Sequence, residues 1–339
     1  MAKEEAAHTL STDSAETEDV IAAYAARRLV IAIPTLIGAT LLVFLMLRVL
    51  PGDVAGVICR GESGEGACSA ETLARLRVEL GLERPLPMQY LTWMGEIARA
   101  DFGNSLASGR LVSGEILHRL PLTLQLALMA EVIAIAIGIP IGLICAVRQD
   151  TWGDYTLRFW SIFFLALPSF WIGLVIILVM VRVFEWMPPT GHHLLWDDPR
   201  NNILQLIWPA LVLASHELAR IARMSRSTML EVLREDYIRT ARAKGLAEQV
   251  VLVRHALKNS LIPVITFTSV YFGHLLAGTV VMEQVFSIPG LGMLFLDSLR
   301  LRDYTIIQAL VLFFVTAFIV INLIVDLLYG WLDPRISYK

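Results

Sequence analysis

The chain has 339 residues with a net charge of −3, 56% of them hydrophobic and 17% charged, and its mean hydropathy is +0.63. A soluble globular protein carries about 45–50% apolar and about 25% charged residues. Apolar runs of about 20 residues, the length of a membrane-spanning helix, recur along this sequence. The composition therefore excludes a soluble protein and indicates an integral membrane protein, in which the placement of charges matters more than their sum.

Residues 1–26 form an acidic segment that we expect to be a disordered cytoplasmic tail. A secretory signal peptide begins with a positively charged region, which this segment lacks. Polar, acidic segments of this kind bury too little apolar surface to fold. The transmembrane domain is then expected over 27–339. The acids of the tail, which face Lys3 alone, are Glu4, Glu5, Asp13, Glu16, Glu18 and Asp19.

Six apolar segments predict an all-α membrane protein with six transmembrane helices. The fourth segment has the weakest pattern, because it contains His216, Glu217 and Arg220. Prolines within the segments, Pro168 among them, are expected to be tolerated, since neighbouring helices can satisfy the freed carbonyls. The expected spans are about 29–50, 122–147, 157–183, 203–222, 263–286 and 306–330.

Basic residues in the short connections place both termini in the cytoplasm. Arginines precede the first span and flank the connection between the second and third, and the connection 223–262 carries eight basic residues. The loop 185–202 is acidic instead, so we expect it outside. The segment 51–120 is also expected outside, because long loops cross the membrane largely regardless of charge. The flanking arginines are Arg27, Arg28, Arg148 and Arg158.

The external segment 51–120 is predicted to contain two amphipathic helices, the first capped near Ser69 or Ala70 and the second ending near Gly103. Cys59 and Cys68 enclose a glycine-rich stretch in this segment. An oxidising compartment permits a disulfide between them, which would stabilise the fold by about 2–3 kcal/mol. Two free thiols are the alternative. A zinc site is not expected, since only two ligands are evident, and Cys145 is expected to be a small packing residue.

After the fifth span, Ile288–Gly292 breaks the helix and an apolar helical pattern resumes. We expect a short helix that dips back into protein, with a surface loop as the alternative.

Polar side chains inside spans are candidates for a translocation pathway, because a central charge costs about 2.5–3.5 kcal/mol. An interhelical structural hydrogen bond is the alternative for each. The candidates are Glu131, His216, Glu217 and His274.

The stretch REDYIRTARAKGL, Arg234–Leu246, is a charged helical segment between two spans. Gly245 is expected to end this helix, and a second amphipathic run follows it. The apolar face of the segment can bind either anionic lipid or a groove in a cytoplasmic protein, and the residues alone leave both open. This face consists of Leu230, Leu233, Tyr237 and Ala241.

The stretch Glu235–Thr266 resembles the long cytoplasmic loop of permeases of peptide-type ABC importers. Arg27–Asp53 resembles the first span of that family, and ELGLERPLPMQYLTWM with DFGNSL resembles its external segment. VFSIPGLGMLFLDSLRLRDYTIIQ and VDLLYGWLDPRISYK resemble its last third, so that the resemblance covers about 27–339. The wider superfamily has an EAA-x3-G pattern in this loop. Arg239, Thr240 and Ala241 stand in its place here, a version typical of the peptide-type branch.

The resemblance implies the permease fold of type I ABC importers, in which this loop provides a coupling helix that sits in a cleft of the cytoplasmic ATPase. It therefore favours protein over lipid as the main partner of the segment. The implied coupling residues are Asp236, Tyr237, Ile238, Arg239, Thr240, Ala241, Arg242, Ala243, Lys244, Gly245 and Leu246.

The resemblance also implies the partners. Two ATPase subunits would bind ATP and Mg, a paralogous permease would complete a heterodimer, and an external binding protein would deliver the substrate. The complex would lie in a bacterial inner membrane, in contact with lipid. The chain has no G-x-x-x-x-G-K-[ST] motif and no metal cluster, so we expect neither an enzyme nor a cofactor, and no nucleic acid. A dipeptide, an oligopeptide, a nickel chelate, glutathione and an opine all remain open as substrates.

A proton-coupled secondary transporter is the main alternative, because it would also use glutamate and histidine inside its spans. Such transporters commonly contain internal repeats, and none is evident here. A membrane-anchored scaffold is a third reading, which six spans with buried polar groups disfavour.

Overall fold

The computed structural model describes residues 30–46, 55–56, 69–79 and 83–332. Their regular structure is helical, apart from one isolated bridge between Asn104 and Leu111. The chain divides into two compact units, one made of 1–115 with 297–339 and the other of 116–296. Cys59 and Cys68 lie outside the described residues, so their disulfide stays a prediction.

The first unit contains the helix Val30–Met46 and the two helices predicted for the external segment. The Ser69 hydroxyl accepts a hydrogen bond from the Thr72 amide at 3.1 Å, which confirms the expected cap. The remaining helices of this unit are α3 (Ala70–Glu79), α4 (Leu86–Ala98) and α13 (Tyr304–Leu332).

An aromatic cluster attaches the helix Val30–Met46 to α4. The Phe44 ring lies 5.5 Å from the Tyr90 ring and 6.2 Å from the Trp93 ring, measured between centroids. The Tyr90 hydroxyl also lies 2.9 Å from the Thr40 hydroxyl. Apolar rings with a polar tip suit a helix pair at a membrane surface, where one end of the side chain can meet water.

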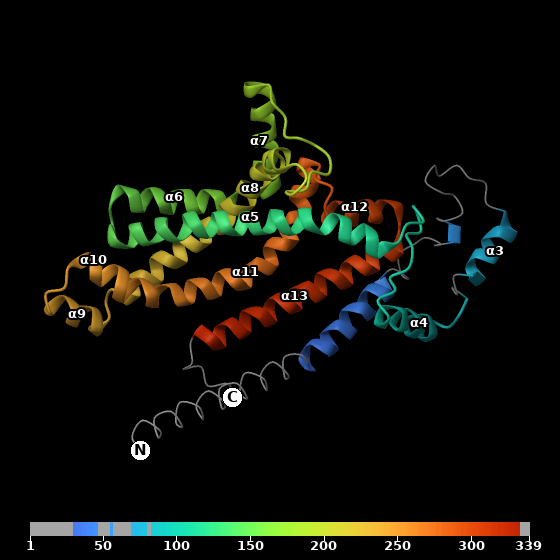
Figure 1. Cartoon of the computed structure of the whole chain (residues 1–339), viewed down its shortest axis with the longest axis horizontal. Helices are drawn as coiled ribbons and strands as arrows, with labels where there is room; N and C mark the ends of the chain where they lie inside the picture. The colour runs from blue at the N-terminus through green and yellow to red at the C-terminus, as the bar shows by residue number, and fades with distance from the viewer. Residues whose placement is uncertain (1–29, 47–54, 57–68, 80–82, 333–339) are drawn as a thin grey trace, which may run out of the picture. The chain divides into compact units, whose positions relative to one another are not determined.

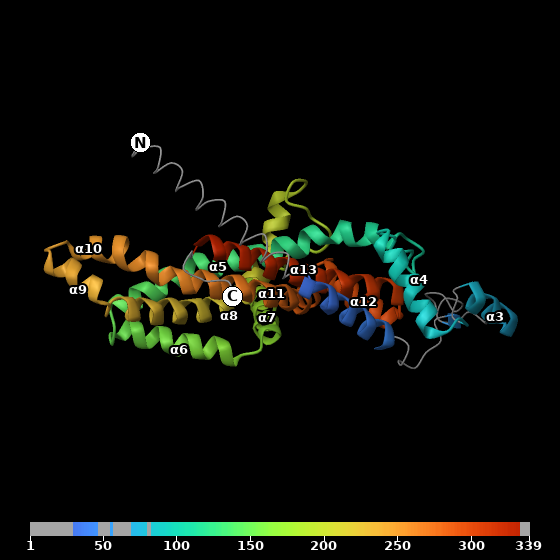
Figure 2. The ribbon, with the colours of Figure 1, turned by 90° about the horizontal axis from the view of Figure 1, so that it is seen from below.

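The second unit contains the helices that run from α5 to the first residues of α12. Figure 1 shows α5, α6, α8 and α11 side by side, with α9 and α10 at one end of this group, and Figure 2 shows the same end from below. The helices are α5 (Val112–Val147), α6 (Trp152–Ala166), α7 (Ser169–Phe184), α8 (Pro199–Val232), α9 (Asp236–Ala243), α10 (Glu248–Val250), the π-helical turn η1 (Val251–Ala256), α11 (Leu257–Phe286) and α12 (Leu291–Leu301).

Three helical segments in the described part of the chain are long and apolar enough to cross a membrane. The bent pair α6–α7 makes a fourth if it counts as one span. The helix Val30–Met46 is apolar but shorter, and α8 contains several charged residues. The all-helical membrane fold is thus confirmed at this level, while the count of six spans stays a prediction. The three segments are Val112–Val147, Glu248–Phe286 and Tyr304–Val325.

The expected continuous span 157–183 is broken, and the prediction that Pro168 is tolerated within it was wrong. Helices α6 and α7 meet at an angle of 99° (Figure 1). Leu167 adopts an extended conformation, with φ −89° and ψ 134°, because a following proline disfavours the helical region. The prolines at 121, 140 and 209 do remain inside helices.

Helices α5 and α8 approach each other closely at two glycines one turn apart. A Cβ atom on Gly142 would lie 2.3 Å from the Ala222 carbonyl oxygen, and one on Gly138 would lie 3.0 Å from the Ile221 side chain. This is the small-xxx-small spacing that lets membrane helices pack backbone against backbone. Residue 131 lies seven positions before Gly138, on the same face of α5, so the α5–α8 contact also positions its side chain.

Candidate functional site

A polar cluster lies between α5 and α8 in the second unit. The carboxylates of Glu131 and Glu217 are buried and interact electrostatically with each other. The Arg220 guanidinium donates a hydrogen bond to Glu217 Oε2 at 3.1 Å. Within the described structure, Glu131 Oε2 and Glu217 Oε1 are buried and receive no hydrogen bond. Two carboxylates in an apolar helix pair are costly to maintain, so these two positions are candidates for a functional site.

The cluster continues onto α11. The Arg220 guanidinium lies 5.2 Å from the centroid of the Tyr271 ring, a distance typical of a cation–π contact. The Tyr271 ring in turn lies 5.5 Å from the His274 ring. His274 is exposed on the surface of the unit. The polar side chains of α5, α8 and α11 thus lead from a buried glutamate to an open helix face.

His216 interacts electrostatically with Glu217, but it makes its hydrogen bond outside the cluster. Its Nε2 atom lies 2.9 Å from the carbonyl oxygen of Leu167, at the break between α6 and α7. The proline after Leu167 prevents the helix from continuing, so this carbonyl needs a partner outside its own helix. His216 therefore stabilises the break between α6 and α7. A structural hydrogen bond, the alternative to a pathway role, fits this residue best. The other three pathway candidates are brought together.

Sequence reasoning did not place Glu283 among the pathway candidates, and the structure shows it as a fully buried carboxylate in α11. Its Oε1 accepts a hydrogen bond from the Thr123 hydroxyl at 2.7 Å, and its Oε2 accepts one from the Met293 amide at 3.0 Å. The Thr123 hydroxyl accepts a further hydrogen bond from the Leu291 amide at 2.8 Å. A carboxylate at the start of α12 satisfies amides that the helix leaves free.

Gly290 and Gly292 leave the space that this carboxylate needs. A Cβ atom on Gly290 would lie 2.4 Å from the carboxyl carbon of Glu283, and one on Gly292 would lie 2.5 Å from the Val280 backbone. The predicted helix break at Ile288–Gly292 and the resumption of a helix after it are confirmed. The hydrogen bonds of Glu283 and Thr123 that hold the start of α12 follow from no local pattern in the sequence.

The charged stretch expected to contact an ATPase forms α9 and the turn after it. Helix α9 ends at Ala243, and Gly245 follows with a positive φ of 76°. Glycine adopts this conformation without steric cost. The Arg242 guanidinium donates to Glu248 at 2.6 Å across the turn, and this hydrogen bond raises the pKa of Arg242 above its ordinary value. The expected end of the helix at Gly245 is confirmed.

Two side chains of α9 face the interior of the unit. Ile238 is completely buried and Ala241 nearly so. They pack in an apolar cluster with residues of α5, α8 and η1, so α9 is anchored to the rest of the unit. The residues of this cluster are Ala146, Met229, Ile238, Ala241, Val251 and Ala256.

The other residues of the stretch are exposed. Tyr237 and Leu246 present apolar surface, with 41% and 40% of their area exposed. Apart from its two chain neighbours, no described residue has an atom within 4 Å of the position that a Cβ on Gly245 would occupy. The remaining exposed residues of the stretch are Asp236, Arg239, Thr240, Arg242, Ala243 and Lys244.

Neither a metal site nor a thiol site emerges among the described residues. Over residues 30–46, 55–56, 69–79 and 83–332, no group of three histidine, cysteine or acidic side chains is arranged to hold a metal ion. Cys145 is buried, and its sulfur lies 3.9 Å from the Gly153 carbonyl oxygen. The expectation that Cys145 is a packing residue is confirmed.

The fold and the site define a class of protein, namely a helical membrane protein with a polar cluster among its spans and a charged hairpin anchored at one end. Residues 138–338 match the family described as "Binding-protein-dependent transport system inner membrane component". Residues 21–127 match the N-terminal model of the same transport-system membrane components. The chain belongs to this family.

Named relatives cover nearly the whole chain. The dipeptide transport system permease protein DppB of Escherichia coli (strain K12) is 40% identical over 336 residues, which cover 92% of this chain and 98% of that protein. The oligopeptide transport system permease protein AppB of Bacillus subtilis (strain 168) is 41% identical over 321 residues, covering 94% of this chain and 100% of that protein.

Family membership confirms the main prediction. The chain is a membrane permease subunit of a binding-protein-dependent ABC importer, located in the inner membrane, and it is not an enzyme. The alternative of a proton-coupled secondary transporter is not favoured.

Proposed function

We propose that this chain forms half of a translocation pathway for peptides, together with a paralogous permease. The names of the E. coli and B. subtilis relatives support a peptide substrate. The open surfaces of the helices support a paralogous partner. In α5, for example, only 39% of the 18-residue apolar stretch is buried within the chain. The basic residues of 223–262 support an orientation with both termini in the cytoplasm.

The pathway would pass the cluster of Glu131, Glu217, Arg220 and His274. The observation that carries this assignment is the pair of buried carboxylates whose cluster reaches an exposed face of α11. Ionisable groups inside membrane proteins usually face the bundle interior or a water-filled cavity. Peptides carry a charged amino and a charged carboxyl terminus, and this cluster offers partners for both.

Two partner ATPases would bind ATP and Mg and would contact the exposed face of α9 and its turn. Tyr237, Gly245 and Leu246 would provide the apolar contact, and the basic side chains would pair at its edge. Ile238 and Ala241 would instead hold α9 to the permease. Because the same unit contains the close α5–α8 packing, a displacement of α9 can be transmitted to helices that bear the carboxylates.

Transport by the complete complex in proteoliposomes tests the pathway. The binding protein and a labelled dipeptide are placed outside, and ATP-dependent uptake is measured. Glu217→Gln should reduce uptake at least tenfold while binding-protein-stimulated ATP hydrolysis persists. Glu231→Gln, which changes an exposed glutamate of the same helix, is the matched control and should transport normally. Normal uptake by Glu217→Gln would exclude the cluster from the pathway, and uptake driven by a proton gradient without ATP would overturn the function.

A further inference from the structure

A basic pocket lies between α6 and α8 in the second unit, away from the carboxylate cluster. Its volume is about 490 Å³, within the range of small-ligand sites. Its lining includes the cationic side chains of Arg158, Arg223 and Arg226 and the apolar side chains of Leu157 and Ile162. The pocket therefore combines cationic and apolar lining residues.

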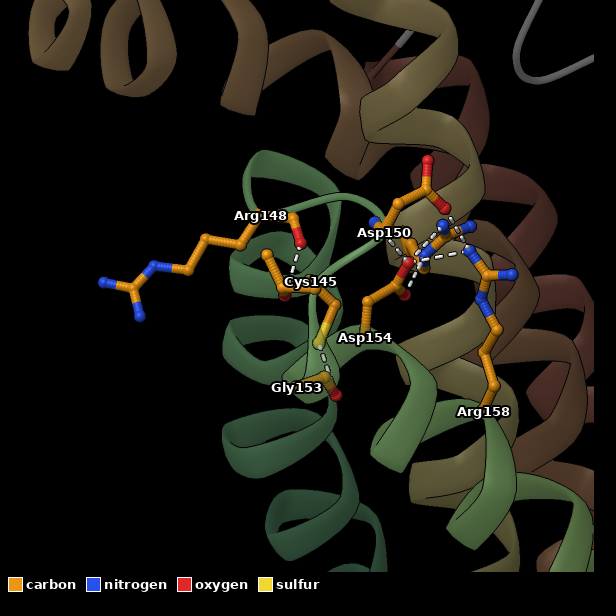
Figure 3. Close-up of polar contacts among 8 residues, drawn as sticks. Cys145, Arg148, Asp150, Gly153, Asp154 and Arg158 are labelled. Carbon is orange, nitrogen blue, oxygen red and sulfur yellow. Dashed lines mark hydrogen bonds and ion pairs between the residues drawn. The ribbon is translucent and has the colours of Figure 1, made fainter.

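The positive charge of the pocket is only partly neutralised by the protein. The carboxylate of Asp154 is buried behind it and accepts hydrogen bonds from Arg226 at 2.6 and 2.8 Å and from Arg158 at 2.7 Å. Figure 3 shows Asp154 beside Arg158, with the side chain of Arg148 pointing away from them. Asp150 lies 3.5 Å from Arg158 at the rim. Within the described structure, Arg223 is exposed and makes no ion pair.

The surface of α6 next to the pocket is apolar and rich in aromatic rings. Trp152, Tyr155, Phe159, Trp160 and Ile162 are all exposed on it. Tryptophan and tyrosine concentrate at the level of the lipid headgroups. Helix α6 is also half of a pair that has the length and composition of a membrane span. The pocket thus opens onto a surface suited to lipid.

We propose that this pocket binds an anionic phospholipid of the surrounding membrane, with its phosphate between Arg223 and Arg158 and its first acyl carbons against Leu157 and Ile162. The cationic side chains favour an anion, and the apolar side chains favour one that carries hydrocarbon. Basic pockets between membrane helices are known to bind lipid headgroups in this way. The inference requires only that α6 lies in the membrane, so it is independent of the transported substrate.

Photolabelling of the complete complex tests the proposal. The permease with its partner subunits is placed in nanodiscs that contain a photoreactive phosphatidylglycerol, and the labelled peptides are mapped after irradiation. We expect adducts on 149–162. Arg223→Gln should reduce this labelling about fivefold, the loss expected for one cation near a lipid phosphate. Arg254→Gln, which removes another exposed arginine outside the pocket, should leave the labelling unchanged.

Further labelling experiments distinguish an anionic lipid from the other ligands that could occupy the pocket. Ile162→Trp, which enlarges an apolar lining side chain without changing the charge, should also reduce the labelling of 149–162. Equal labelling by a photoreactive phosphatidylcholine would overturn the preference for anionic lipid. Displacement by excess inorganic phosphate would identify a free-anion site instead. Labelling that occurs only after the partner subunits are removed would show that protein covers the pocket, and would overturn the proposal.

Discussion

Arg226 in α8 donates two hydrogen bonds to the carboxylate of Asp154 in α6, from Nε at 2.6 Å and from a terminal nitrogen at 2.8 Å. The Asp150 amide and the Arg158 side chain donate to the same carboxylate. This ion pair joins the first turn of α6 to the helix that carries Glu217. A bidentate, buried pair of this kind fixes geometry as well as charge.

Asp154→Asn is expected to destabilise the permease by about 3–5 kcal/mol, because it leaves buried guanidinium charge without its partner. Thermal unfolding of the purified protein in detergent measures the loss. Asp150→Asn is the control, since the Asp150 side chain is 61% exposed whereas that of Asp154 is fully buried. The exposed pair should contribute about 0–1 kcal/mol. Equal losses in the two variants would contradict the assignment of the buried pair.

Gly142→Ala is expected to separate α5 from α8, because the new Cβ would lie 2.3 Å from the Ala222 carbonyl oxygen. Overpacking of a tight contact costs about 1–3 kcal/mol. Gly95→Ala in α4 is the matched control, since nothing lies within 4 Å of its Cβ position. Removing a glycine from an open helix should stabilise it by about 0.5–1 kcal/mol. The unfolding temperature and the rate of peptide uptake should both fall in the Gly142→Ala variant and not in the Gly95→Ala variant.

Glu283→Ala is expected to loosen the turn between α11 and α12. It removes the acceptor of the Met293 amide and of the Thr123 hydroxyl, and each buried donor left without a partner costs about 1–3 kcal/mol. Hydrogen exchange of 288–296 measures the effect and should be faster. Glu283→Gln keeps an oxygen acceptor and should show a smaller increase. Unchanged exchange in the alanine variant would mean that the carboxylate does not hold this turn.

Ile238 and Tyr237 are neighbours in α9 with opposite expected roles. Ile238→Ala removes a fully buried side chain, so it should destabilise the protein by about 2–5 kcal/mol. Tyr237→Ala changes an exposed side chain and should leave the unfolding temperature nearly unchanged. It should instead weaken the contact with the ATPase, so that peptide-stimulated ATP hydrolysis falls. A stable, fully coupled Tyr237→Ala protein would remove Tyr237 from the proposed contact.

Features that depend on neighbouring residues were predicted from the sequence. The cap at Ser69, the break at Ile288–Gly292 and the helix end at Gly245 each follow from the conformational preference of one or two residues. The match to a transport permease rests on ordered motifs, and family membership confirms it. Local conformational preferences and long motifs can thus be recognised from the amino-acid sequence alone.

Features that depend on distant residues could not be predicted. Asp154 meets Arg226 across 72 positions, and Thr123 meets Glu283 across 160. Helical periodicity correctly placed Ala241 on an apolar face, but it does not say whether the chain's own core or a partner covers that face. Likewise, a proline within an apolar run does not by itself tell whether the helix continues through it or breaks. The outcome depends on which neighbouring helix satisfies the freed carbonyl.

A series of substitutions at Gly245 separates the two reasons why glycine stands there. The positive φ of 76° disfavours alanine, while asparagine tolerates it, and the open surroundings leave room for any side chain within the chain itself. If only the turn matters, Gly245→Asn and Gly245→Trp should differ little from each other in uptake beyond their effect on stability. We expect instead that Gly245→Asn retains most transport and that Gly245→Trp abolishes it with membrane insertion intact, because the bulky ring blocks the ATPase. Co-purification of the ATPase subunits with each variant provides the measurement, and normal ATPase binding and uptake by the tryptophan variant would refute a coupling role for this turn.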